Sequence, residues 1–279
     1  FDAQNLDRDN TAVILNEKQE MSEPLSDEEA KRQMSQRSRR GFLIGGATAL
    51  AGIFGWRLMP NEIKQNLFRR AFEFNEKVSQ IFYSPKQLAP EFPRELAGAR
   101  VNGMEGLGGE FNAADWRLRV GGLANQSEDL ILTLEDIKAL PRVEMTTELK
   151  CIEGWSIVCN WTGVRFSDFI VKYQPKTRDG NAPDTANHPE NLLPYVSLAT
   201  PDAGYYVGWD LPSILHPQTL LAYEMNGAPL TMEHGAPLRL ATATKYGIKQ
   251  IKRIGRIEFT DVRPKDFWTE RGYDWYAGH

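Results

Sequence analysis

The chain has 279 residues, of which 41% are hydrophobic and 25% are charged, and its formal net charge is −4. These are the values of an ordinary globular protein, and they exclude the strongly basic surface with which proteins bind nucleic acid. Two cysteines are too few for a disulfide framework. The length allows one domain of roughly 170–200 residues with extensions.

The N-terminal segment has the composition of a targeting signal rather than of a folded domain. Residues 1–40 are polar and acidic up to Glu29, and they predict a disordered cytoplasmic tail. The stretch 38–44, Ser-Arg-Arg-Gly-Phe-Leu-Ile, resembles the twin-arginine export signal and opens an apolar run. An ordinary membrane helix with chance arginines is the alternative.

The apolar run has no good cleavage site after it. Ala-x-Ala patterns occur only inside the run, too early for a signal peptidase. We therefore expect residues 41–59 to form an uncleaved helix that tethers the protein to the inner membrane, with the domain on the periplasmic side. Cleavage, which would give a soluble periplasmic protein, is the other possibility.

Residues 60–95 are expected to form an amphipathic helix and an extended linker. Pro60 suits the first helical turn, and Pro85 ends the helix. One apolar face comprises Ile63, Leu67, Ala71, Phe74, Val78 and Ile81. This face could pack on a partner or on the membrane surface, but we expect it to pack on the chain's own domain.

Residues 96–279 show short strands and short helices in irregular alternation. This order favours an α+β fold over a parallel doubly wound sheet. We expect strands at 116–120, 143–149, 195–199, 220–224, 237–240 and 254–259. We expect helices at 133–140, capped by Thr133 and stopped by Pro141, and at 164–170, capped by Ser167.

The two cysteines differ in their settings. Cys151 ends the strand-like run 143–149 and precedes Gly154-Trp155. A thiol beside a turn is well placed to meet a ligand, although a lone cysteine is often only a small buried hydrophobic residue. Cys159 has no such setting, and we expect it to be a structural thiol.

Five ordered motifs change the interpretation of Cys151. They occupy residues 150–155, 161–163, 221–227, 234–240 and 245–252. Together they resemble the sulfite-oxidase superfamily of molybdopterin enzymes over about residues 96–259. Within it the chain is most similar to the bacterial periplasmic branch, whose best-known member is the catalytic subunit of the methionine-sulfoxide reductase system.

The resemblance implies a molybdenum–molybdopterin cofactor, with Cys151 as the catalytic residue and the thiolate ligand of the metal, which suits a soft sulfur donor. It implies cofactor contacts from Asn102, Glu105, Gly106, Thr200, His234, Arg239, Gln250, Ile251 and Lys252. Arg239 would grip the pterin phosphate, and the 250–252 turn would present backbone N–H groups to the anion. His234 stands where the family usually has an asparagine, and both side chains can donate a hydrogen bond.

Two departures from the family bear on the substrate. Gly103 and Met104 replace bulkier residues, so the mouth of the pocket should differ. The residues after Cys151 lack the arginine that helps sulfite oxidases to bind their anion, and Glu153 would oppose an anion if it faced the pocket. Lys150 is expected to point away from Cys151, because side chains alternate along a strand.

The sequence therefore predicts an exported oxidoreductase that catalyses two-electron oxygen-atom transfer, with reduction of a small sulfoxide-type substrate as the favoured direction. No Cys-x-x-Cys-His motif is present, so a membrane haem or quinol-linked subunit would supply the electrons. The twin-arginine machinery would export the chain. One alternative is oxidation of sulfite or another small anion with electrons passed to a cytochrome. The other is a non-catalytic binding module that keeps the fold.

Overall fold

The computed structural model describes residues 55–101 and 103–278. Contacts divide the chain into two units, Phe1–Lys64 and Gln65–His279. The expected tail and most of the expected anchor helix lie outside the described residues. Among the helices that are described, none is long and apolar enough to cross a membrane.

Helix α3 (Asn61–Phe82) begins directly after Pro60 and ends before Pro85, as the sequence predicts. The expectation that its apolar face packs on the domain is wrong. Within the second unit, Leu67, Phe74 and Ile81 are exposed by 51%, 66% and 76%. Polar groups make the contacts instead. Arg263 pairs with Glu76 of the helix at 2.7 Å, and Tyr83, the residue after the helix, donates its hydroxyl to the Pro212 carbonyl.

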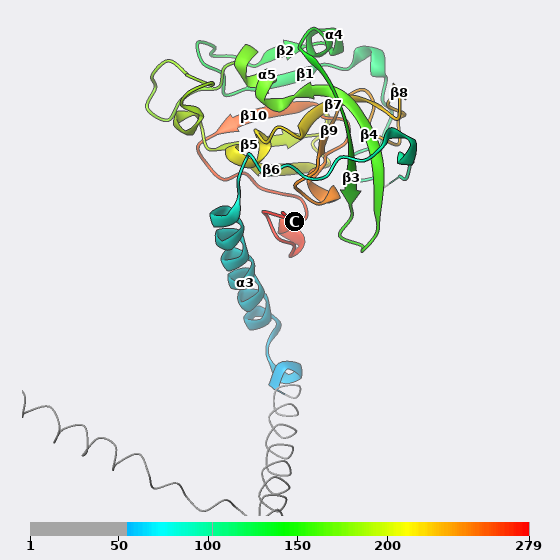
Figure 1. Ribbon diagram of the computed structural model, residues 1–279. Helices are drawn as coiled ribbons and strands as arrows, with labels where there is room; N and C mark the ends of the chain where they lie inside the picture. The colour runs from blue at the N-terminus through cyan, green and yellow to red at the C-terminus, as the bar shows by residue number, and fades with distance from the viewer. Residues whose placement is uncertain (1–54, 102, 279) are drawn as a thin grey trace, which may run out of the picture. The chain divides into compact units, whose positions relative to one another are not determined.

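Two sheets form the body of the second unit (Figure 1). The first has the order β2-β1-β10-β5-β6, and only its β1–β10 pair is parallel. Its strands are β1 (Leu118–Gly121), β2 (Leu130–Leu132), β5 (Tyr195–Ala199), β6 (Tyr206–Asp210) and β10 (Arg256–Thr260). The second is antiparallel, with β9 pairing to β7 beside the path β3-β4-β7-β8. Its strands are β3 (Arg142–Lys150), β4 (Ser156–Arg165), β7 (Thr219–Met225), β8 (Ala228–Pro229) and β9 (Arg239–Thr242).

Short helices lie between the strands, which confirms the α+β class. Helix α4 (Leu134–Lys138) is capped by Thr133 in a capping box with Asp136, as predicted. Helix α6 (Leu211–Ile214) follows β6. The short 3₁₀ turns are η1 (Arg94–Leu96), η2 (Ala113–Asp115), η3 (Pro189–Asn191), η4 (Gly247–Lys249) and η5 (Thr269–Arg271).

Helix α5 (Phe166–Lys172) starts later than the sequence predicts, and Ser167 does not cap it. Val164 belongs to β4, where it pairs with Leu221 and is completely buried. Pairing within the sheet therefore holds the chain extended up to Arg165, which stands at the N-cap without a side-chain hydrogen bond. Long-range pairing has overridden the local capping signal.

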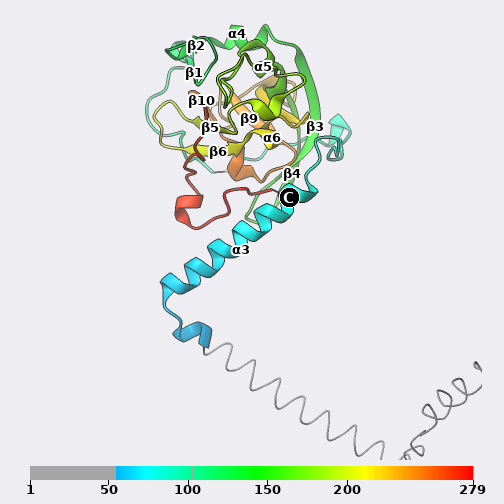
Figure 2. The same cartoon turned by 90° about the vertical axis from the view of Figure 1, so that its left-hand side faces the viewer.

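The main hydrophobic core lies between the sheets and includes Leu118, Phe166, Leu198 and Ile257. A smaller cluster around Trp161 packs on the second sheet. β3 and β4 pair along their length from Arg142–Val164 to Lys150–Ser156, so they form a long hairpin. Figures 1 and 2 show its tip on the same side of the domain as the C-terminal segment.

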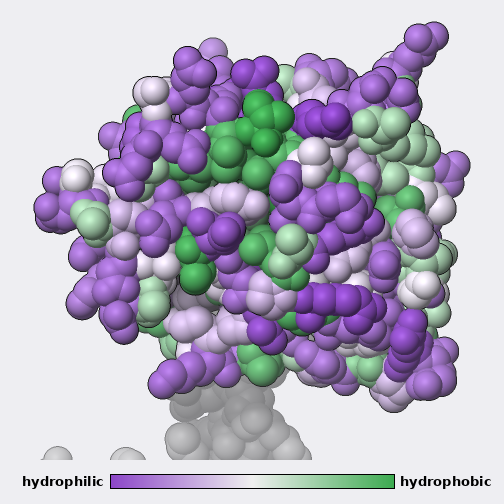
Figure 3. Space-filling model, turned by 90° about the horizontal axis from the view of Figure 1, so that it is seen from above, coloured by the Kyte–Doolittle hydropathy of each residue, from purple (hydrophilic) through white to green (hydrophobic). Residues whose placement is uncertain are grey.

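One face of the second unit is mostly polar. Figure 3, which views the molecule from above, shows a largely hydrophilic face with apolar patches between polar side chains. Ile131, Val171 and Val262 are examples of exposed apolar residues in the described part of the chain. Single exposed apolar residues of this kind are normal for a soluble domain.

Candidate active site

The tip of the β3–β4 hairpin carries Cys151. A tight turn forms there because the Cys151 N–H donates to the Trp155 carbonyl at 2.9 Å and the Gly154 N–H donates to the Cys151 carbonyl at 3.1 Å. Gly154 has a φ of +84°, which a glycine adopts without strain. The strand end and the turn together present the thiol beside a cavity, as the sequence predicts.

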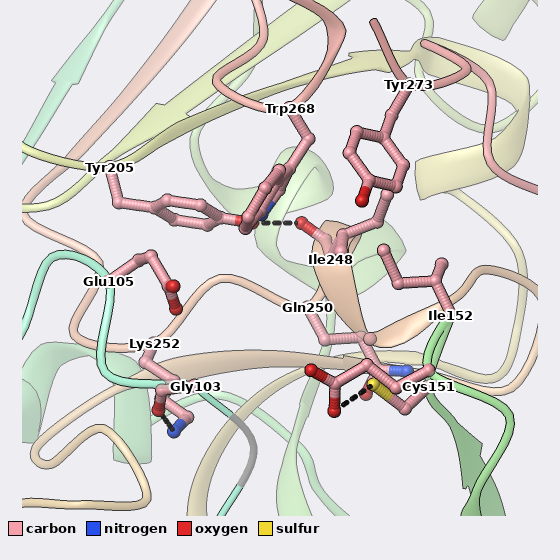
Figure 4. Close-up of a pocket in the computed structure, with 12 residues that line it drawn as sticks. Gly103, Glu105, Cys151, Ile152, Tyr205, Ile248, Gln250, Lys252, Trp268 and Tyr273 are labelled. Atoms are coloured by element: carbon pink, nitrogen blue, oxygen red, sulfur yellow. Dashed lines mark hydrogen bonds between the residues drawn. The ribbon is translucent and has the colours of Figure 1, made fainter. Parts of the chain in front are cut away.

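This cavity has a volume of about 160 Å³ (Figure 4). It brings together four segments that are far apart in the sequence: 103–105, 151–153, 247–252 and 268–273, with Tyr205 beside them. The lining residues are Gly103, Glu105, Cys151, Ile152, Glu153, Tyr205, Gly247, Ile248, Gln250, Lys252, Trp268 and Tyr273. Four of the predicted site residues, Glu105, Cys151, Gln250 and Lys252, therefore line one cavity together with aromatic residues that the sequence did not point to.

Cys151 is half-buried and free. Its sulfur lies 3.8 Å from a carboxylate oxygen of Glu153. Burial is the main cause that raises the pKa of the Cys151 thiol, and the negative charge of Glu153 adds to it, against smaller lowering effects of the Glu153 N–H and of Arg100. The protein alone therefore favours the thiol, whereas a bound metal ion would stabilise the thiolate.

Arg239 on β9 is a buried cation without an acidic partner among the described residues. Its Nη1 donates to the His234 carbonyl at 3.1 Å and its Nη2 to the Gln250 carbonyl at 3.3 Å. The guanidinium lies over the Trp161 ring, 4.6 Å from the centroid. Burial lowers the pKa of Arg239 to about 10. A buried charge is costly unless it is paired, so this position is suited to an anion.

Other charged and polar groups of residues 234–253 are also incompletely paired. The Nζ atom of Lys252 donates only to carbonyls, those of Gly103 at 2.9 Å and Glu233 at 2.8 Å. Burial, followed by the charge of Arg239, lowers the pKa of Lys252 to about 8. Seven buried side-chain atoms of the described residues lack a hydrogen-bond partner, and three of them lie within residues 234–253: His234 Nε2, Gln250 Oε1 and Arg253 Nε.

The charged and incompletely paired groups of residues 234–253 test whether the site fits the expected cofactor. Arg239, Lys252 and His234 offer donors that the oxygens of an anion would satisfy. Gln250 Oε1 is an acceptor and fits a donor group of the ligand instead. Burial is also the main cause that lowers the pKa of His234, and the neighbouring Arg239 and Lys252 lower it further. The residues present fit a phosphate-bearing pterin next to a thiolate ligand.

The other predicted contacts take different places. Glu105 lines the cavity. Gly106 has a φ of +72°, and a Cβ there would lie 2.5 Å from the Thr200 side chain. The Thr200 hydroxyl donates to Asp202 at 2.6 Å, and Thr200 does not line the cavity. Ile251 has its side chain in the main core. Asn102 lies outside the described residues.

The remaining predictions about cysteine and lysine agree with the structure. Cys159 is buried and free, and burial raises its pKa to about 11. Lys150 lies away from Cys151 and lines a separate cavity. Cys151, in contrast, meets an open cavity, which is the geometry expected of a binding thiol rather than of a core residue.

Trp268, Tyr273, Tyr205 and Ile248 are the lining residues that sequence reasoning missed. The only local signal was the density of aromatic residues after 259, in Phe-Trp at 267–268 and Tyr-Asp-Trp-Tyr at 273–276. Such density is as typical of a core as of a site. The placement became visible only in three dimensions.

The comparisons with known proteins identify the family of the chain. The family model described as "Oxidoreductase molybdopterin binding domain" matches residues 107–268. The chain belongs to this family. It is a molybdenum-dependent oxidoreductase, and its cofactor is molybdenum–molybdopterin.

Two relatives match more of the chain than the family model does, and a third matches about half of it. The "Putative protein-methionine-sulfoxide reductase subunit YedZ1" of Azospira oryzae is 31% identical over 86% of this chain and 88% of its own length. The "Protein-methionine-sulfoxide reductase catalytic subunit MsrP" of Campylobacter jejuni is 29% identical over 86% of this chain and 80% of its own. The MsrP of Xanthomonas axonopodis pv. citri is 34% identical over 55% of this chain, and the match spans about half of that relative, 47%.

Proposed function

We propose that this chain is the catalytic subunit of a sulfoxide reductase. The observation that carries the proposal is the cavity in which the Cys151 thiol meets the 247–252 segment. Arg239, which is buried and has no acidic partner among the described residues, donates to the Gln250 carbonyl of this segment. Relatives that are named protein-methionine-sulfoxide reductases support the choice of a sulfoxide. The same names support oxygen-atom transfer in the reducing direction.

The residues of the site would divide the work of holding the cofactor. The Cys151 thiolate would bind the molybdenum. Arg239 and Lys252, with His234, would bind the pterin phosphate, and the Gln250 side-chain oxygen would accept from a donor group of the cofactor. When bound, the cofactor supplies two-electron transfer of an oxygen atom. Glu105, Gly106, Thr200 and Ile251 would be further cofactor contacts, and the proposal for Asn102 lies outside the described residues.

The chain's own residues can supply the protons. Reduction of a sulfoxide to a thioether consumes two electrons and two protons and releases one water molecule. Glu105 and Glu153 are the carboxyl groups that line the cavity, and carboxyl groups within hydrogen-bond reach of a reacting oxygen can donate protons. Trp155 Nε1 donates to Glu153 at 3.0 Å and holds this carboxylate beside the thiol.

Oxidation of sulfite is the second candidate, and Lys252 favours it, because its ammonium group lines the cavity and could attract a small anion. Two carboxylates, Glu105 and Glu153, line the same small cavity and oppose a dianion. The balance of charge therefore supports a neutral substrate such as a sulfoxide. Assays with sulfite and with methionine sulfoxide separate the two candidates.

We also propose the cellular setting. The twin-arginine pattern supports export with a domain order of 1–40 tail, 41–59 anchor, 60–95 helix and linker, and 96–279 oxidoreductase. The exposed apolar face of α3 supports association with the periplasmic surface of the inner membrane. A membrane haem or quinol-linked subunit, or a cytochrome, would supply the electrons.

Metal analysis tests the proposal. The full chain, purified from a molybdenum-replete host, should contain molybdenum and pterin at close to one per chain and should reduce methionine sulfoxide with a reduced dye as electron donor. The Cys151→Ser variant should lose turnover and keep its fold. Cys159→Ala is the matched control and should retain both. A wild-type protein without molybdenum refutes the proposal.

A further inference from the structure

The C-terminal segment supplies one wall of the cavity. Trp268 and Tyr273 line it together with Tyr205, Ile248 and Ile152. Figure 4 shows the Trp268 and Tyr273 rings across the cavity from Cys151. Tyr273 lies beyond the residues that the family model matches, so this part of the wall is not explained by the shared domain.

The rings of this wall pack against one another. Trp268 and Tyr273 have ring centroids 5.2 Å apart at an interplanar angle of 74°. Phe267 packs on Trp268 at 5.4 Å and on Tyr205 at 5.0 Å. The Tyr205 hydroxyl donates to the Ile248 carbonyl at 2.6 Å. The edge-to-face and tilted contacts fix the rings, so the wall is a formed surface rather than a set of loose side chains.

Asp266 ties this wall to the cofactor side of the cavity. Its Oδ2 accepts from Lys249 Nζ at 2.6 Å and from the Gly208 N–H at 3.2 Å. Its Oδ1 accepts from the backbone N–H groups of Trp268 at 3.2 Å and Thr269 at 3.1 Å. The Lys249–Asp266 pair is buried. Asp266 is therefore a positioning residue that fixes the aromatic wall relative to the 247–252 segment.

The two halves of the cavity differ in chemistry. Glu105, Glu153 and Lys252 make one half polar, which suits a polar S=O group and protons. The other half is apolar and aromatic. A thioether sulfur gains about 0.3–1.5 kcal/mol from contact with an aromatic ring, and methylene groups gain further from burial. An alkyl chain on the sulfur therefore fits the aromatic half.

We propose that Trp268 and Tyr273 determine specificity by binding the alkyl chain of the substrate, and that they select a sulfoxide with the length of an oxidised methionine side chain over a small dialkyl sulfoxide. The inference rests on the proposed function. It adds which residues of this chain recognise the substrate and which part of the substrate they recognise.

Steady-state kinetics of the molybdenum-loaded full chain test this wall. The substrates are N-acetyl-methionine-sulfoxide methylamide and dimethyl sulfoxide. Tyr273 is partly exposed, so Tyr273→Ala should fold normally. It should raise KM for the methionine derivative about three- to tenfold and change kcat and the KM for dimethyl sulfoxide less than twofold. Trp268→Leu should act in the same direction, and Phe74→Ala, an exposed aromatic change on α3, should change neither KM.

A binding measurement separates the inference from the proposed function. Calorimetry with the thioether product, N-acetyl-methionine methylamide, should show weaker binding to Tyr273→Ala by the same factor. If the wild type reduces methionine sulfoxide and both variants keep the wild-type ratio of the two KM values, the proposed role of Trp268 and Tyr273 is refuted while the proposed function stands. If the wild type reduces no sulfoxide, the proposed function is refuted. If, in addition, the thioether does not bind or binds equally well to Tyr273→Ala, the proposed role of Trp268 and Tyr273 is refuted as well.

Discussion

The buried cation Arg239 allows a sharp test of the cofactor site through the variant Arg239→Met. The pKa of this guanidinium falls from an ordinary 12.5 to about 10, which corresponds to a cost of about 3 kcal/mol for the charged form. Methionine removes this cost but leaves the carbonyls of His234 and Gln250 without donors, at about 1–3 kcal/mol each. Since the effects oppose each other, the free energy of unfolding of the cofactor-free variant should lie within about 3 kcal/mol of the wild-type value.

Inorganic phosphate distinguishes an anion site from an ordinary buried arginine. A ligand at ten times its Kd stabilises the folded state by about 1.4 kcal/mol. For a domain of this size, that amounts to a rise in Tm of roughly 3–5 °C. Thermal unfolding of cofactor-free wild type, in phosphate against chloride at equal ionic strength, should show this rise. Arg239→Met should not.

The matched control is Arg256→Met. Arg256 is paired with Asp129 at 2.9 Å and Glu258 at 2.7 Å, so it has no need of an anion. This variant should keep the phosphate-dependent rise in Tm. A rise of equal size in Arg239→Met and in wild type would refute the assignment of Arg239 to the phosphate, whatever the pterin content of the purified protein.

Three further predictions follow from buried groups and close contacts. Asp266→Leu should reduce the free energy of unfolding by about 3–5 kcal/mol, because it leaves Lys249 buried and unpaired, and adding Lys249→Met should recover most of the loss in urea denaturation. Burial lowers the pKa of Lys245 to about 7. Between this value and 10.5 the unfolded chain binds a proton that the native lysine lacks, so the free energy of unfolding should rise with pH by a few kcal/mol. The Lys245→Met variant should show a flatter rise. Gly106→Ala places a Cβ against Thr200 and Tyr205 at positive φ and should cost at least about 2 kcal/mol, whereas Gly108→Ala, with open space around it, should cost little; equal costs would contradict the contact.

The position of Cys151 could be predicted from the sequence because the signals were local. A strand-like run, a thiol and a glycine-containing turn follow one another along the chain, and β3 with its turn repeats that order. The capping of α4 by Thr133 was predictable for the same reason. Ordered motifs then identified the family, whose shared domain covers residues 107–268.

Features that depend on long-range contacts could not be predicted. The Lys249–Asp266 pair joins two segments with no local relation, and it brings Trp268 to the cavity. Pairing of Val164 with Leu221 displaced the start of α5. The apolar periodicity of α3 showed correctly that the helix has an apolar face, but a periodicity carries no information about what covers that face.

The group of cations around Arg239 has a consequence for the life of the protein in the cell. Arg239 is buried without an acidic partner among the described residues, and its charge lowers the pKa of Lys252, so an anionic cofactor bound there would make the loaded state more stable than the cofactor-free one. Cofactor-free chains therefore unfold more often and are cleaved by proteases more readily. The amount of this protein in a cell should thus follow the supply of molybdenum, even when its synthesis is constant.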